Sequence, residues 1–135
     1  MSQKITSILL ALSALALVAT PTTALAGTCG VLPFSAGEGV KRGAAPNISA
    51  LVSSELDIRG GYDLVIAAPA EDFEGGDCGS STSCIREFGK ANKHEAVVAG
   101  RVEVAGSEYF LTLKLHNGST AAVIREVTAL SLIHI

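Results

Sequence analysis

The most constraining feature of this sequence is a region of alternating apolar and polar residues between positions 94 and 127. The stretches "HEAVVAGRVEVAG" and "EYFLTLKLHNG" place apolar side chains at every second residue, which is the period of a half-buried β-strand. Gly106–Ser107 and Asn117–Gly118 are expected to form two-residue hairpin turns, and Asn-Gly is a strong type I′ signal. With "TAAVIREVTA" as a third strand, the sequence predicts a three-stranded antiparallel meander.

The residues before the meander predict two helices, each preceded by a strand. "VLPF" (31–34) is a short apolar run that predicts a buried strand, and Pro33 favours a strand end there. After Pro46, Asn47 is a suitable N-cap for a helix whose apolar residues recur at helical spacing up to the glycines of "RGG". The continuous apolar run "YDLVIAAP" then predicts a strand covered on both faces. A second helix follows, with Ser83 as its cap.

These elements occur in the order β-α-β-α-β-β-β. The expected fold class is α/β (more strictly α+β), with a mixed β-sheet and two helices on one of its faces. A mature chain of about a hundred residues is enough for one core, so a single domain over residues 27–129 is predicted.

The first 26 residues have the organisation of a secretory signal peptide. Lys4 provides a positive charge, the apolar run after it is too short to span a bilayer comfortably, and Ala24 and Ala26 form an A-x-A signature. We expect cleavage between Ala26 and Gly27, and a mature protein in the periplasm or cell envelope. The alternative is a retained membrane anchor. Lipid attachment at Cys29 is not predicted, because alanine stands where a lipobox has leucine.

The mature domain is mildly acidic. Of the 10 Lys and Arg residues, Lys4 lies in the signal peptide, and the nine that remain stand against 13 acidic residues, a formal net charge of −4. A domain of this charge lacks the electrostatic footprint of a protein that binds nucleic acid or an anionic membrane.

The chain ends on "LSLIHI" (130–135), an apolar segment without a turn or a polar tail. Residues 130–135 are therefore expected to be a non-native or truncated end, and the natural protein is expected to continue beyond residue 129. A genuine final strand is the alternative.

Four segments of the mature chain follow one another in a familiar order: "VLPF", "ISALVSSEL" (48–56), "CIREFGKANKHEAVVAGRV" (84–102) and "EYFLTLKLHNGSTAAVIREV" (108–127). This ordered set resembles the amino-terminal α/β domain of the periplasmic protein TolB and the related FlgO-type domains of bacterial envelope proteins. The chain departs from the family pattern at Asn92-Lys93, where the family usually has Leu-Gly. Lys93 in a left-handed conformation costs about 1 kcal/mol, unless the helix ends one residue early at Asn92.

The resemblance implies a non-catalytic module of the bacterial envelope that contacts other envelope proteins. It therefore implies no enzyme activity and no cofactor or metal, an envelope protein as partner, and membrane contact only through a missing C-terminal region. Two alternatives remain: a ligand-sensing domain of an envelope signalling protein, and a thiol-redox enzyme.

Cys78 and Cys84, in "CGSSTSC", bear on the redox alternative. A disulfide oxidoreductase typically has Cys-x-x-Cys at a helix N-terminus, and a zinc site needs two close pairs of ligands; this spacing fits neither. An oxidising compartment favours disulfides. We therefore predict a disulfide between Cys78 and Cys84, which would stabilise the fold by up to about 2 kcal/mol. Pairing of Cys29 with Cys84 is the rival.

Contact surfaces are predicted from expected exposure. They are the loop 36–42, an acidic loop, and the edge strand 121–127, because edge strands accept partner strands readily. The acidic loop lacks the D-x-D-x-D-G order of a calcium loop, so we expect a solvated loop. The candidate contact residues in the two loops are Lys41, Arg42, Glu71, Asp72, Glu74 and Asp77.

Overall fold

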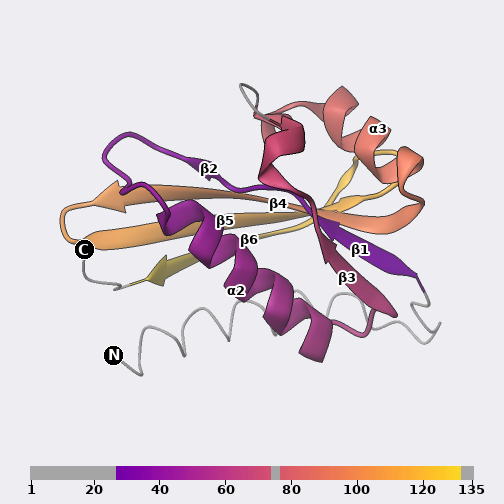
Figure 1. Cartoon of the computed structure of the whole chain (residues 1–135), viewed down its shortest axis with the longest axis horizontal. Helices are drawn as coiled ribbons and strands as arrows, with labels where there is room; N and C mark the ends of the chain where they lie inside the picture. Colours follow the sequence, from indigo (N-terminus) through magenta and orange to yellow (C-terminus); the bar gives the residue numbers. More distant parts are fainter. Residues whose placement is uncertain (1–26, 74–76, 132–135) are drawn as a thin grey trace.

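The computed structural model of the chain describes residues 27–73 and 77–131. It contains one mixed six-stranded sheet and two α-helices (Figure 1). The predicted fold class is therefore confirmed. Within these two ranges, no helix is long and apolar enough to cross a membrane. The predicted signal peptide, including Ala26, lies outside the described residues.

The strands are β1 (Thr28–Val31), β2 (Ser35–Ala36), β3 (Leu64–Ala67), β4 (His94–Ala105), β5 (Glu108–Asn117) and β6 (Val123–Ser131). The helices are α2 (Ala44–Arg59) and α3 (Thr82–Ala91), and two short 3-10 helices, η1 (Ala70–Phe73) and η2 (Cys78–Ser80), lie between β3 and α3. The sheet order is β3-β1-β4-β5-β6, with β2 paired to β4. Strand β1 is parallel to both β3 and β4, and β4, β5 and β6 form the predicted antiparallel meander.

The second connection of the meander is longer than the predicted two-residue turn. Strand β5 ends at Asn117 and β6 begins at Val123. The side-chain oxygen of Asn117 accepts hydrogen bonds from the backbone N–H groups of Ser119 (2.9 Å) and Thr120 (3.1 Å), which stabilises a wider loop. Gly118 also donates its N–H to the carbonyl oxygen of Glu95 (2.9 Å). The loop therefore folds back onto β4 instead of closing a tight hairpin.

Strand β1 and helix α2 both begin about three residues earlier than predicted. Strand β1 ends at Val31, because Pro33 has no N–H to continue the ladder. Helix α2 begins at Ala44 rather than after Asn47. Pro46 then lies in its first turn, where the backbone N–H groups have no partner inside the helix and proline is tolerated.

Helix α3 begins and ends close to the predicted positions. The cap is Ser81 rather than Ser83, and its side chain accepts a hydrogen bond from the N–H of Cys84 (3.2 Å). The helix ends at Ala91, and Lys93 has a φ of 55°. The chain therefore keeps the left-handed conformation at the position where the resembled family has glycine.

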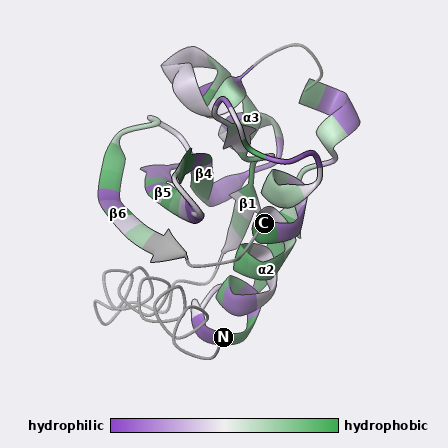
Figure 2. Ribbon diagram, turned by 90° about the vertical axis from the view of Figure 1, so that its left-hand side faces the viewer, coloured by the Kyte–Doolittle hydropathy of each residue, from purple (hydrophilic) through white to green (hydrophobic). Residues whose placement is uncertain are grey.

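The two helices lie on opposite faces of the sheet, so the expectation that both cover one face was wrong. Strand β4 shows the division: Ala96 and Val98 pack in the core under α2, whereas Val97 and Ala99 pack in a second core with Ile85 of α3. Figure 2 shows α2 and α3 as separate layers around the strands. Residues 96–99 are apolar without alternation, and this pattern is typical of a strand covered on both faces.

Strand β3 was expected to be covered on both faces, and this too was wrong. It is the end strand of the sheet, and the side chains of Leu64 and Ile66 are 50% and 43% exposed. Val65, between them, packs against the core under α2. Helix α3 packs mainly against β4, so the face of β3 on the α3 side stays open.

Candidate interaction surface

A disulfide joins Cys78 in η2 to Cys84 in the first turn of α3, and their Cα atoms are 5.3 Å apart. This is the predicted pairing. The rival pairing of Cys29 with Cys84 is absent, because Cys29 is a free thiol buried in the core under α2 and Cys84 packs on the other face of the sheet. The disulfide and the Ser81 cap together fix where α3 begins.

Replacing both Cys78 and Cys84 with serine is expected to lower the free energy of unfolding by about 2 kcal/mol, because the unfolded chain loses a constraint on a short loop. Urea denaturation followed by circular dichroism measures the change. Reductant should shift the midpoint of the unmodified chain in the same direction and leave that of the double variant unchanged. An equal response of both proteins to reductant would contradict the assignment.

Cys29 is unsuited to redox chemistry. It is the only free cysteine among residues 27–73 and 77–131, and burial raises the pKa of its thiol from 9.0 to about 12. The thiolate is the reactive form of cysteine. At neutral pH Cys29 therefore behaves as a small buried apolar group.

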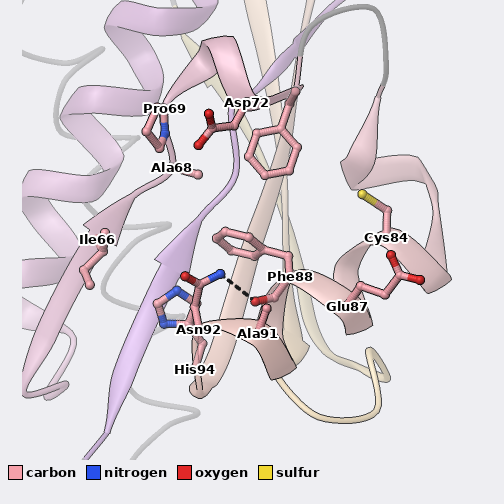
Figure 3. A pocket seen from close by; sticks show the side chains of 11 residues that line it. Ile66, Ala68, Pro69, Asp72, Cys84, Glu87, Phe88, Ala91, Asn92 and His94 are labelled. Atoms are coloured by element: carbon pink, nitrogen blue, oxygen red, sulfur yellow. Dashed lines mark hydrogen bonds between the residues drawn. The ribbon is translucent and has the colours of Figure 1, made fainter.

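A groove of about 400 Å³ opens between β3 and α3 (Figure 3). Ile66 and Pro69 lie on its β3 side, and Phe88 and Ala91 of α3 lie opposite them. The N-terminal residue of β4, His94, lies at its base. The groove thus lies over the part of the sheet that α3 leaves uncovered.

Aromatic rings form the base of the groove. The ring of Phe88 contacts that of Phe73 edge-on, with centroids 5.7 Å apart, and its centroid lies 5.2 Å from that of the His94 ring. Both the Phe88 and His94 rings lie against Gly30 of β1, where an added Cβ would come within 2.7 Å of Phe88 and 2.5 Å of His94. A larger residue at position 30 would displace the rings, so glycine is what lets them lie on the sheet.

His94 is held in place, and its burial favours the neutral imidazole. Its Nδ1 atom is hydrogen-bonded to the hydroxyl of Thr28 at 2.7 Å, and burial lowers the pKa of the imidazole below its ordinary value. A buried imidazole packed against an aromatic ring and bonded to a neighbouring strand supports the base of the groove.

The charged residues of the groove are both acidic. Asp72 of η1 lies above the aromatic base, and Glu87 lies on the outer side of α3 (Figure 3). Both side chains are exposed, and neither forms an ion pair with another described residue. The groove therefore combines apolar walls with a negative rim.

The predicted loop residues lie apart from one another. Lys41 and Arg42 are exposed between β2 and α2, whereas Glu71 and Asp72 are exposed in η1, and Figure 1 places the loop after β2 at the opposite end of the molecule from α3. Glu74 lies outside the described residues. Asp77 is exposed and accepts a hydrogen bond from the Ser80 hydroxyl. Of the five that the structure describes, only Asp72 lines the groove.

The predicted edge strand is at an edge of the sheet. Strand β6 is the last strand in the sheet order, and Val123 and Ile124 are 54% and 47% exposed. Figure 2 shows this apolar stretch on the outer side of the molecule. The strand continues through Leu130 and Ser131, which pair with Phe110 and Tyr109. Residues 132–135 lie outside the described residues.

Neither protein-family models nor curated proteins match this chain. Solved structures match it in fold. The LpoB C-terminal domain from Escherichia coli has a TM-score of 0.64 at 9% identity, over 92% of this chain and 94% of that chain. The PelC dodecamer from Paraburkholderia phytofirmans has a TM-score of 0.59 at 18% identity, over 82% of this chain and 74% of that chain. Lipoprotein GNA1162 from Neisseria meningitidis has a TM-score of 0.54 at 17% identity, over 81% of each chain.

The predicted resemblance to TolB is supported only at the coarser level of this shared fold. TolB from Acinetobacter baumannii matches with a TM-score of 0.48 at 13% identity, over 77% of this chain and 23% of that chain. At such identities the comparisons show the architecture and not the activity. The chain thus has a fold that it shares with the LpoB C-terminal domain, with PelC and with a bacterial lipoprotein.

Proposed function

We propose that this chain is a non-catalytic protein-interaction module of the bacterial cell envelope. The observation that carries the proposal is that both edges of the sheet expose aliphatic side chains: Leu64 and Ile66 on β3, and Val123 and Ile124 on β6. Soluble proteins usually protect sheet edges with charged side chains, prolines or a covering segment. Strand β3 has no charged residue and no proline, so its edge lacks this protection and is suited to adding a partner strand, whereas β6 carries the exposed charges of Arg125 and Glu126 beside its aliphatic residues.

Three further observations support the envelope as the place of action. The first 26 residues have the pattern of a signal peptide. The disulfide between Cys78 and Cys84 is suited to an oxidising compartment. Among the proteins that share the fold, GNA1162 is a lipoprotein and PelC forms a dodecamer, so the fold occurs in a lipoprotein and in a protein assembly.

Ligand sensing is the second candidate function. The groove between β3 and α3 favours it, because its volume of about 400 Å³ falls in the range of small-molecule sites. We rank it second because the groove is open to solvent along β3, whereas small ligands are usually held in clefts that bury most of their surface.

Site-specific photo-crosslinking in the native bacterium tests the proposed function. A photoreactive amino acid replaces Ile66 or Ile124, one at each edge, and Ser54, exposed on α2, is the matched control position. We expect protein adducts in the envelope fraction at one or both edges and none at Ser54. Adducts equally frequent at all three positions, or absent from both edges, would refute an interaction through the sheet edges. Recovery of a bound small molecule from Ile66 alone would favour the ligand sensor.

A further inference from the structure

We propose that the groove between β3 and α3 is a binding site for a small organic amine, held as its ammonium ion, with an apolar body such as a phenyl group. The groove lies over β1, because its aromatic rings rest against Gly30 of that strand. It shares only Ile66 with the exposed aliphatic residues of the sheet edges. The inference therefore goes beyond the proposed function and can be tested separately from it.

The walls of the groove suit the apolar body of such a ligand. Ile66 and Pro69 on the β3 side lie across from Phe88 and Ala91 of α3 (Figure 3), and the volume between them is about 400 Å³. A ligand that covers these side chains removes apolar surface from water, which favours binding. Because the groove is open along β3, one side of the ligand stays in water. We therefore expect weak binding, with a dissociation constant on the order of 1 mM.

The aromatic rings favour a positive charge on the ligand. Phe73 and Phe88 are in edge-to-face contact, with ring centroids 5.7 Å apart, and both side chains line the groove. The face of an aromatic ring carries partial negative charge, which attracts an ammonium group and repels a carboxylate. A cation with an apolar body therefore matches the rings in both of its parts.

The carboxylates of the groove favour the same charge. Asp72 lies beside Pro69 at one end of the groove, and Glu87 lies on the outer side of α3 (Figure 3). Neither carboxylate forms an ion pair with another described residue, and no Lys or Arg of the described residues lines the groove. An ammonium ion would be attracted by both carboxylates without displacing another cation, whereas an anionic ligand would be repelled.

The neutral polar groups of the groove point to a ligand that donates hydrogen bonds. The side-chain N–H of Asn92 already donates to the carbonyl oxygen of Phe88 (2.9 Å), and the Nδ1 atom of His94 is bonded to the hydroxyl of Thr28 (2.7 Å). The groups that remain for a ligand include the carboxylate oxygens and the side-chain oxygen of Asn92, and all of these accept hydrogen bonds. A primary ammonium group has three N–H donors. Donor capacity and charge therefore indicate the same class of ligand.

The test is a titration of the isotope-labelled purified chain, followed by NMR of its backbone amide groups. The probe is phenethylammonium, and two probes of similar shape differ from it in charge: neutral phenethyl alcohol and the anion hydrocinnamate. We expect saturable shifts in α3, η1 and the end of β3. Phenethylammonium should bind about fivefold more tightly than the alcohol, the effect of two weakly screened ion pairs, and the difference should shrink as salt is raised.

Three results of this titration would overturn the inference. Binding of the alcohol as tight as that of phenethylammonium would make the groove an unselective apolar site. Tighter binding of hydrocinnamate would contradict the charge assignment. Shifts confined to residues outside the groove would show that the amine binds elsewhere on the molecule.

Variants of the chain locate the charge recognition. Asp72→Asn combined with Glu87→Gln should weaken binding of phenethylammonium about fivefold and leave binding of the alcohol unchanged. Asp57→Asn removes an exposed carboxylate of α2 and should change neither. Ala91→Trp should fill the groove and block both probes without unfolding, because Ala91 is exposed at the end of α3, and circular dichroism confirms the fold. An unchanged affinity for phenethylammonium in the carboxylate double variant would sink the proposal.

Other outcomes separate this inference from the proposed function. Protein adducts at Ile124 in the cell, together with no charge preference among the probes, would overturn the amine site and leave the proposed function standing. Selective amine binding with no adducts at either edge would do the reverse. Concentration-dependent self-association that Ala91→Trp abolishes, seen by sedimentation of the chain alone, would make a second copy the occupant and overturn the assignment to a small amine.

Discussion

Replacing Gly89 with alanine is expected to destabilise the protein by about 3 kcal/mol, although helix propensity predicts the opposite. Gly89 lies inside α3, where alanine is normally favoured over glycine by about 1 kcal/mol. Its α-carbon, however, lies against the backbone of Gly118, and an added Cβ would overlap the carbonyl oxygen of Gly118. Backbone cannot rotate away as a side chain can, so α3 or the loop after β5 must shift and lose packing.

Chemical denaturation of the Gly89→Ala variant measures this effect, and Gly37→Ala is the matched control. A Cβ on Gly37 would first meet the Glu103 side chain, at 3.2 Å, and that side chain is free to move. We expect a change within about 0.5 kcal/mol for the control. A Gly89→Ala variant as stable as the unmodified chain would show that α3 and the loop do not approach this closely.

The second large effect is expected at Leu113, where alanine should lower the free energy of unfolding by about 3 kcal/mol. Leu113 lies in the middle of β5, is 1% exposed, and packs in the core under α2. Truncation removes buried methyl groups and leaves a cavity that the neighbouring strands fill only in part.

Leu64→Ala is the matched control, because it makes the same chemical change in another strand. Leu64 is 50% exposed on the open edge strand β3, and we expect a loss of less than about 1 kcal/mol. Urea denaturation of the two variants gives the comparison. Similar losses at the two positions would contradict the assignment of β3 to an open edge.

Local sequence patterns predicted most of the elements. The structure contains strands β4 and β5, which alternation predicted, and helix α2, which helical spacing predicted. It also contains the predicted disulfide between Cys78 and Cys84. The family pattern left open whether Lys93 keeps the left-handed conformation or the helix ends early at Asn92, and Lys93 keeps it. These features depend on residues close in sequence, and such interactions are visible in a single sequence.

Features that depend on how distant elements pack were predicted poorly. The apolar run in β3 was taken as a sign of burial, but burial depends on whether α3 reaches over that strand, and it does not. The Asn117-Gly118 pair marked a turn, but its length is set by contacts of Gly118 with β4 and α3. The groove was missed for the same reason, since Ile66, Phe88 and His94 belong to three separate elements. The apolar run 96–99 in β4 could have indicated that the sheet is covered on both faces, because a strand buried on both sides has no polar residue in alternation.

The order of strands in the sheet also constrains the order in which the molecule can form. Strands β4, β5 and β6 pair with their neighbours in sequence, so they close short loops and can assemble early. Strand β1 lies between β3 and β4, and its pairing with β4 joins positions such as Thr28 and His94, 66 residues apart. Closing this long loop costs more entropy. We therefore expect the C-terminal meander to be the folding nucleus, and insertion of β1 to be the late step that buries Cys29 and forms the base of the groove.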